Sequence, residues 1–180
     1  MPTTNTSKAF RILSFDTSLS LPGVAIIEVK RDRKGVAKPT IIALSHVKTN
    51  TSQSHGLRAD IVESWATLFL ALHAPKGFDA IVREDFQGRS SKQNHPVFAA
   101  WSGVDRALHK FGLNFTTPAI SQSAVKKAVV GSGKAEKWEV ADAVRKLTGY
   151  DGEFVTADES DAAAIGLAYL IREGIIETEG

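Results

Sequence analysis

The sequence predicts an α/β protein with one five-stranded mixed sheet and helices on both of its faces. Three apolar stretches of strand length open the chain at residues 10–15, 24–29 and 40–47, separated by short polar turns. Strands joined this closely pair antiparallel. From residue 54 the apolar spacing changes to a helical period, and strands then alternate with helices. Because a crossover helix returns the chain to a parallel neighbour, the later strands are expected to be parallel.

The first crossover helix is expected over residues 54–74, where Pro75 and Gly77 end it. Large apolar side chains share one of its faces, namely Leu57, Ile61, Trp65, Leu68 and Leu72, with Val62 and Phe69 beside them. A fourth strand follows over residues 78–82 and closes on a polar segment, residues 83–85. Open α/β sheets place their sites where parallel strands end, so the ends of the first and fourth strands should meet at one such edge.

The second half of the chain completes this pattern. A polar segment at residues 88–94 precedes a helix that contains Pro96 in its first turn and stops at Gly112. A short fifth strand is expected over residues 113–117. Three helices follow, near residues 124–130, 135–147 and 158–174. Three strands, a helix, a strand, a helix, a strand and then helices is the order of elements in the ribonuclease H-like fold.

Length and composition narrow the class of protein. The 180 residues are 43% hydrophobic, which suits a single globular domain over residues 1–180 with flexible tails at 1–8 and 175–180. The absence of cysteine excludes disulfide and thiolate-metal sites, and the polar N-terminus lacks the apolar core of a signal peptide. We therefore expect a cytoplasmic protein. The net charge of +2 does not by itself indicate a nucleic-acid partner.

Four carboxylates, far apart in the chain, are placed where they can meet at one sheet edge. Asp16 lies near the end of the first strand, Glu84 follows the fourth, and Asp158 and Asp161 project from one face at the start of the last helix. Ordinary structural roles exist for two of them, because Asp16 could close its own turn and Asp158 could cap the helix. Asp161 instead opens an alanine-rich segment suited to close packing, where an ionised carboxylate needs a cation.

A metal site explains these acids best. Mg²⁺ and Mn²⁺ prefer carboxylate oxygens, and a pair of such ions can activate water and stabilise the leaving oxygen in phosphoryl displacement. We therefore expect Asp16, Glu84, Asp158 and Asp161 to hold two Mg²⁺ or Mn²⁺ ions. The five histidines lack zinc-site spacing, residues 131–134 match a phosphate-binding loop only weakly, and no Ser–His–Asp order stands out.

Three sequence blocks resemble the bacterial RuvC Holliday-junction resolvases. Residues 125–137, VKKAVVGSGKAEK, are similar to the family's VK-x-x-VVG-x-G-x-AEK run. Residues 158–165, DESDAAAI, resemble its D-x-x-DALAI ending, and residues 12–16, ILSFD, with Gly23 resemble its I-L-G-I-D-P-G opening. The resemblance implies a homodimeric crossover junction endodeoxyribonuclease that uses Mg²⁺ or Mn²⁺ and nicks four-way DNA junctions symmetrically. Branched DNA is then the substrate, and a branch-migration helicase is the expected partner.

The resemblance also suggests individual roles. Water held between two metal ions would attack a backbone phosphate in line, leaving 5′-phosphate and 3′-hydroxyl ends, with the four acids as metal ligands and Lys137 stabilising charge. Phe86 resembles the aromatic residue that the family presents for base stacking, although a core phenylalanine is the ordinary alternative. The basic side chains expected to contact phosphates are Lys126, Lys127, Lys134, Arg89 and Lys92.

The chain departs from the family in two regions. Residues 17–22, TSLSLP, replace the family's Pro-Gly turn, and residues 83–101 differ from its loop and helix. These departures favour a divergent bacterial or phage resolvase. In the second region, Phe98 and Trp101 exceed what one helix face needs, so the helix at 96–111 is a candidate dimer interface.

Two alternatives from other functional classes stay open at the level of sequence. One is a non-catalytic junction-binding or scaffolding protein on the same fold. The other is an actin-like tRNA-modification partner, because residues 15–18, FDTS, also suit the opening of that group. The glycine-rich P-G-S-F-T-G stretch of that group is absent here, which counts against it.

Overall fold

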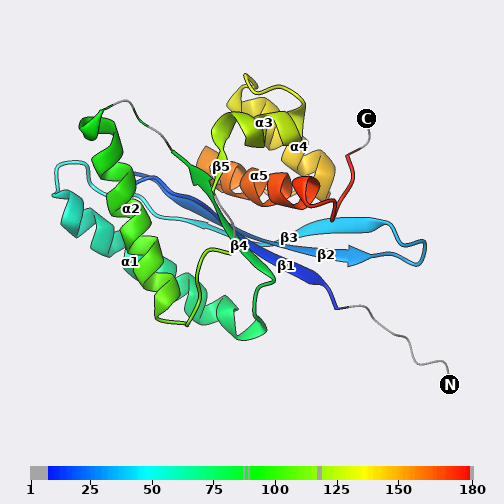
Figure 1. Ribbon diagram of the computed structural model, residues 1–180, viewed down its shortest axis with the longest axis horizontal. Coiled ribbons are helices and arrows are strands. Elements are labelled where there is room, and N and C mark those ends of the chain that lie inside the picture. The colour runs from blue at the N-terminus through cyan, green and yellow to red at the C-terminus, as the bar shows by residue number, and fades with distance from the viewer. Residues whose placement is uncertain (1–7, 87, 89, 117–118, 179–180) are drawn as a thin grey trace.

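The computed structural model describes residues 8–86, 88, 90–116 and 119–178 and contains one five-stranded sheet (Figure 1). The strands are β1 (Phe10–Asp16), β2 (Gly23–Arg31), β3 (Ala37–His46), β4 (Ala80–Asp85) and β5 (Ile120–Ser121). Their order across the sheet is β3-β2-β1-β4-β5. The first three strands pair antiparallel, and β1 with β4 and β4 with β5 pair parallel, which confirms the predicted mixed sheet.

Helices cover both faces of the sheet, as predicted. They are α1 (His55–His73), the short 3₁₀ turn η1 (Ala74–Lys76), α2 (Ser91–His109), α3 (Gln122–Val130), α4 (Lys137–Thr148) and α5 (Ala157–Arg172). Helices α1 and α2 lie on one side of the sheet, and α3, α4 and α5 lie on the other (Figure 1). Side chains alternate along β1, so Leu13 and Phe15 belong to the apolar core under α1 and α2, and Ile12 belongs to the core under α3, α4 and α5.

Helix α5 packs closely on the centre of the sheet because its inner face carries small residues. Ala162, Ala163 and Ala164 are completely buried, and the Ser14 hydroxyl of β1 donates a hydrogen bond of 2.7 Å to the Ala162 carbonyl. A side chain at Gly166 would come within 2.8 Å of the same hydroxyl. This contact fixes the N-terminal half of α5 directly over the end of β1.

Helix α1 does not bury the face that the large apolar residues suggest. Its buried residues are Arg58, Ala59, Val62, Ala66, Phe69 and Leu70. Leu57, Leu68 and Leu72 are instead exposed by 47%, 70% and 79%. The reason is that α1 must pack against both the sheet and α2, so small residues such as Ala59 and Ala66 occupy the contact face. The outer leucines are left facing solvent.

Two predicted element boundaries were wrong. Helix α2 begins at Ser91, inside the segment expected to be a polar loop, and includes Pro96, which forgoes only one bond near the helix start. The fifth strand is not at residues 113–117 but at Ile120–Ser121, while Thr117 lies outside the described residues. The expected segment does contact the sheet, because the Thr116 N–H donates a 3.0 Å hydrogen bond to the Ile81 carbonyl of β4 and the Phe115 ring lies 6.2 Å from that of Phe15, but these contacts do not form a strand ladder.

The C-terminal segment, expected to be a flexible tail from residue 175, is anchored at its start because Ile176 is buried in the core.

Within the part of the chain that the structure describes, no helix is both long and apolar enough to cross a membrane.

Candidate functional site

The ends of two neighbouring strands bring the first two predicted acids together. Asp16 ends β1, and Glu84 lies one residue before the end of β4. The parallel register pairs Phe15 with Arg83, so Asp16 and Glu84 follow as the next neighbours. Strand alternation turns both carboxylates toward the face covered by α5, the face to which the Ser14 hydroxyl also points.

The start of α5 is locked against the same strand end. Gly23 pairs with Asp16 across β1 and β2, and its Cα lies directly against the backbone of Asp158. A β-carbon at Gly23 would overlap the Asp158 carbonyl oxygen and lie 2.6 Å from the carbonyl carbon. Only glycine allows α5 to begin here. Asp158 in the first turn of α5 and Asp161 in the next are thereby held over Asp16.

Glu159, which no sequence pattern singled out, holds the start of α5 in place through contacts with β3 and with the loop before α5. Its buried carboxylate lies 2.8 Å from Nδ1 of His46 on β3 and accepts a 2.9 Å hydrogen bond from the Val155 backbone N–H. These contacts tie the start of α5 to β3 and to the preceding loop. Nothing in the local run of acids distinguishes Glu159 from a surface residue, because its partner His46 is remote in sequence.

Electrostatics show that the four predicted acids share one environment. Burial raises the pKa of Asp16 well above its usual value, and the negative charges of Glu84, Asp161 and Asp158 raise it further. Burial, with the Asp161 charge, raises the pKa of Glu84 from 4.5 to about 7. Burial and Asp158 also raise the pKa of Asp161, against the opposing effect of Lys137. The fold therefore concentrates negative charge at this edge.

Two lysines partly balance these acids. The Nζ atom of Lys137, at the start of α4, lies 3.5 Å from Oδ2 of Asp161. Burial opposes the charge of Lys137, but Asp161 and Asp158 outweigh it and raise the pKa of this lysine. The charge of Lys126 on α3 lowers the pKa of Glu84 and of Asp161. Both lysines line one small pocket together with Glu84 and Asp161.

The donor chemistry of this cluster fits a hard divalent cation. Carboxylate oxygens are the ligands that such ions prefer, and a cation would relieve the repulsion that raises the pKa of Asp16 and Glu84. The cluster is not a closed cage, because no three His, Asp or Glu side chains of the described residues are already grouped tightly enough to hold an ion. The side chains would therefore need to draw together around a bound ion.

The remaining predicted site residues that the structure describes are exposed at the surface. Phe86 directly follows β4 and is 38% exposed, and Lys92 is exposed in the first turn of α2. Lys127 is exposed on α3, and Lys134 is exposed in the loop before α4. Arg89 lies outside the described residues.

The opposite face of the sheet uses Trp101 for internal packing. Its Nε1 donates a 2.6 Å hydrogen bond to the Thr17 hydroxyl, next to Asp16. The Arg83 guanidinium lies 4.0 Å from the Trp101 ring centroid and 4.7 Å from that of Phe115. Trp101 is thus partly buried and engaged in contacts within the fold, whereas Phe98 is 48% exposed.

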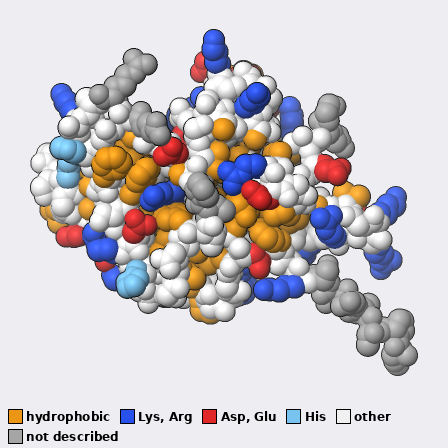
Figure 2. Space-filling model, in the orientation of Figure 1, with side chains coloured by type: hydrophobic (Ala, Val, Ile, Leu, Met, Phe, Trp, Pro, Cys, Tyr) orange, Lys and Arg blue, Asp and Glu red, His pale blue; other side chains and the backbone are white. Residues whose placement is uncertain are grey.

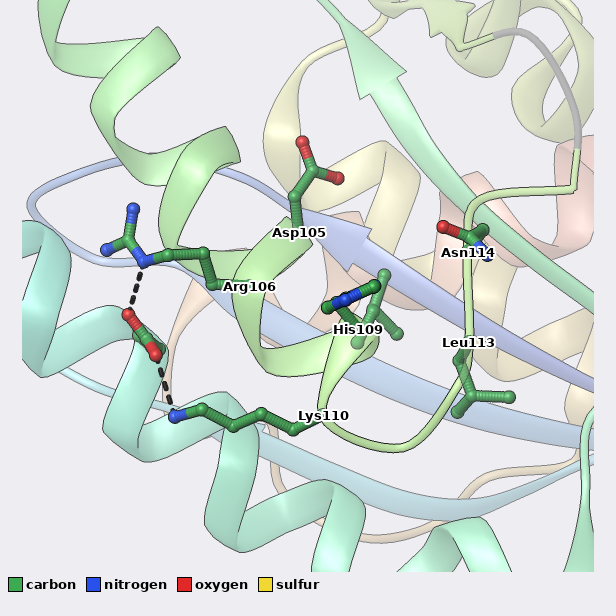
Figure 3. A pocket seen from close by; sticks show the side chains of 8 residues that line it. Asp105, Arg106, His109, Lys110, Leu113 and Asn114 are labelled. Carbon is green, nitrogen blue, oxygen red and sulfur yellow. Dashed lines mark hydrogen bonds and ion pairs between the residues drawn. The ribbon is translucent and has the colours of Figure 1, made fainter.

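A larger cavity, about 510 Å³, lies near the C-terminal end of α2 and contains none of the predicted site residues (Figure 3). Its two main cations, Arg106 and Lys110, both pair with Glu63 of α1, at 2.5 and 2.7 Å. Hydrogen bonds from Lys110 and Arg106 lower the pKa of Glu63. We interpret these ion pairs as structural contacts that hold α1 against the C-terminal end of α2.

The raised pKa of Glu84 predicts how stability of the metal-free protein depends on pH. Its carboxyl binds a proton more tightly when folded, with a pKa of about 7, than at the ordinary value of 4.5. This contribution to stability is present below pH 4.5 and is lost as the pH rises to about 7. Because Glu84 is partly exposed, we expect a loss of about 1–3 kcal/mol.

Urea unfolding in EDTA at pH 4.5 and pH 8 measures this loss. Because the pKa values of Asp16 and Asp161 are raised as well, Glu84→Gln should reduce the difference by about 1–3 kcal/mol without abolishing it. Glu177→Gln, at an exposed position, should leave the difference unchanged. Equal pH profiles for the protein and Glu84→Gln would contradict the prediction.

Comparisons with known proteins identify relatives of this chain. The family model described as crossover junction endodeoxyribonuclease RuvC matches residues 12–169. The protein of that description from Streptomyces griseus is 31% identical over 172 residues, which cover 90% of this chain and 76% of the relative. The Thermus thermophilus RuvC structure is similar with a TM-score of 0.73 and 24% identity, over 92% of this chain and 97% of that one.

A second solved structure, T. thermophilus RuvC in complex with Holliday junction substrate, is similar with a TM-score of 0.76 and 22% identity. The match covers 92% of this chain and 96% of that one. These likenesses confirm the predicted ribonuclease H-like fold.

Proposed function

The chain belongs to the RuvC family of crossover junction endodeoxyribonucleases, and on this premise we propose that it resolves four-way (Holliday) DNA junctions as a metal-dependent, structure-selective endonuclease. The observation that carries the proposal is the convergence of Asp16, Glu84, Asp158 and Asp161 from three elements, where burial and neighbouring carboxylates raise the pKa of Asp16, Glu84 and Asp161. A cluster of hard oxygen donors beside two lysines suits hydrolysis of a phosphodiester.

In this proposal the four carboxylates hold Mg²⁺ or Mn²⁺, two ions per active site. Such ions, when bound, supply charge neutralisation and activation of water for in-line attack on the phosphate. Lys137 remains protonated because Asp161 and Asp158 raise its pKa. Its ammonium group is therefore available to stabilise negative charge on a phosphate at the cluster. The products are 5′-phosphate and 3′-hydroxyl ends.

A small group of basic side chains, rather than a broadly positive face, contacts the DNA. Acidic and basic side chains are interspersed on the face seen in Figure 2, and the net charge is only +2. Phosphates of the substrate contact the basic side chains Lys126, Lys127, Lys134, Lys92 and Arg89. Phe86, exposed just past the strand that carries Glu84, stacks on a base of the junction. Binding that depends on phosphate contacts weakens steeply as salt rises.

A homodimer would supply two such sites for paired cuts. With Trp101 committed to internal packing, the outer face of α1 is the better candidate interface, because Leu57, Leu68 and Leu72 expose apolar side chains there. Phe98 of α2 is a further exposed apolar side chain, with its ring against that of Trp101. A branch-migration helicase is the expected further partner.

Synthetic junctions test the proposal. The protein is incubated with Mg²⁺ and a labelled four-way junction, a flap or a linear duplex of the same sequence, and cleavage should be confined to the junction. Junction binding without cleavage would favour the non-catalytic alternative. Equal cleavage of junction and duplex would overturn the resolvase function. The actin-like alternative is not favoured, because the curated relatives are endonucleases by description.

The salt dependence of binding should change when one proposed phosphate contact is removed. Each phosphate neutralised on duplex DNA contributes about 0.9 to the slope of log affinity against log salt. Lys127→Ala should therefore lower the slope by about 1. Lys76→Ala, in η1 before β4 and away from the acids, should leave it unchanged. Fluorescence anisotropy of a labelled junction in EDTA measures both, and identical slopes for the two variants would contradict the assignment of Lys127.

A further inference from the structure

Trp138 is an exposed aromatic residue that directly follows Lys137 in the chain, and none of the roles above uses it. It is the second residue of α4, and 69% of it is exposed. In the described part of the chain its ring has no hydrogen bond and no aromatic partner. The other two tryptophans differ, because Trp65 and Trp101 both donate hydrogen bonds within the fold.

The position of Trp138 is fixed by the helix that carries it. Val140 and Val144 bury the inner face of α4, and Lys137 reaches Asp161 from the first residue of the helix. Successive helical residues are about 100° apart, so Trp138 projects one step around the helix from Lys137. A capping box between Glu136 and Glu139 closes this turn, with the Glu136 N–H donating a 2.7 Å hydrogen bond to the Glu139 carboxylate.

The surroundings indicate what could cover this ring. Lys137 and Lys126 line the pocket that contains Glu84 and Asp161, and Lys134 is exposed three residues before Lys137. A polyanionic strand drawn to these lysines would pass beside the indole. Nucleobases stack on aromatic side chains without regard to sequence, whereas an apolar protein partner would have to bury the flanking charges.

We propose that Trp138 stacks on a nucleobase adjacent to the scissile phosphate and so positions the strand for cleavage. This inference rests on the proposed junction-cleaving function. Phe86 follows the strand that supplies Glu84, and Trp138 follows the lysine that pairs with Asp161, so on each of two elements an exposed aromatic residue comes shortly after a residue of the acidic site. Trp138 is a positioning residue that contacts substrate beside the reacting phosphate.

A double-mutant cycle tests the contact. Junction affinity is measured in EDTA by anisotropy for the protein, Trp138→Ala and Trp138→Phe, with intact junctions and with junctions that carry one abasic site at each position flanking the mapped cut. Trp138→Ala should weaken binding of the intact junction roughly 5- to 100-fold, and Trp138→Phe should recover most of this loss. At one flanking position the abasic site and Trp138→Ala should not be additive.

The controls separate this inference from the proposed function. Val36→Ala, at an exposed apolar position on the β2–β3 hairpin, should bind like the unaltered protein. If the protein cleaves junctions but Trp138→Ala shows additive effects at every flanking position, the stacking role is overturned while the nuclease function stands. The stacking role is likewise overturned if Trp138→Ala binds normally because another protein surface covers the indole. If the unaltered protein fails to cleave, the proposed function itself fails.

Discussion

Replacing Asp161 with asparagine is expected to abolish junction cleavage while junction binding is retained. Asparagine keeps the shape of the side chain but removes a negative charge and a hard oxygen ligand. Because Asp161 adds to the charge that raises the pKa of both Asp16 and Glu84, its loss weakens the cation affinity of the whole cluster. Even an outer partner of a metal ligand is worth roughly 10–100-fold in activity, so the rate should fall by about 100-fold or more.

Single-turnover cleavage of a labelled junction measures this rate, and mobility shift in EDTA measures binding. Asp151→Asn, at an exposed position in the loop before α5, is the matched control and should cleave normally. Thermal unfolding should show Asp161→Asn to be folded, because one of several mutually repelling charges has been removed. Cleavage within a few-fold of the unaltered protein would show that Asp161 is not part of the reactive centre.

Replacing Gly23 with alanine should impair cleavage nearly as strongly, although Gly23 has no side chain to take part in chemistry. The added methyl group would overlap the Asp158 carbonyl oxygen, so either β2 or the start of α5 must shift. That shift separates Asp158 and Asp161 from Asp16, which pairs with Gly23. A displacement of about 1 Å at a reacting centre can lower the rate roughly 100-fold.

Gly56→Ala is the matched control because a β-carbon at Gly56, in the first turn of α1, meets no atom within 4 Å. This variant should cleave normally and be slightly more stable, as alanine favours a helix. Circular dichroism establishes whether Gly23→Ala is folded, and single-turnover rates with raised Mg²⁺ show whether the defect lies in ion binding. Normal cleavage by Gly23→Ala at low Mg²⁺ would contradict the close approach of α5 to β2.

The order of elements could be predicted from sequence because it depends on local patterns. The apolar run that ends at Asp16 and the crossover to the strand that ends in Glu84 place both acids at one edge by topology alone. The buried face of α1 could not be predicted, because two adjacent faces carry apolar residues and the choice depends on how closely α2 and the sheet approach. The smaller residues of α1 form its contact with α2 and the sheet, so the face with the largest apolar side chains was the wrong choice for the buried face.

The contacts that hold the acidic residues in place could not be predicted from the sequence either. Glu159 is buried by His46, a residue on the third strand, and Gly23 is required by the backbone of Asp158 rather than by its own turn. Such contacts join elements that are remote along the chain, so no local spacing reveals them. Trp101 is a similar case, because its partner Thr17 lies in the turn that replaces the family's Pro-Gly.

The alternation of side chains along β1 has a wider consequence. Ser14 and Asp16 belong to the chemical side of the sheet, while Leu13 and Phe15 belong to the side covered by α1 and α2. The sheet therefore separates the acidic cluster from the side of the molecule on which Leu57, Leu68 and Leu72 of α1 are exposed. Substitutions on the solvent-exposed side of α1 would therefore leave the acidic residues undisturbed, whereas changes in α2 would reach them through the hydrogen bond from Trp101 to Thr17.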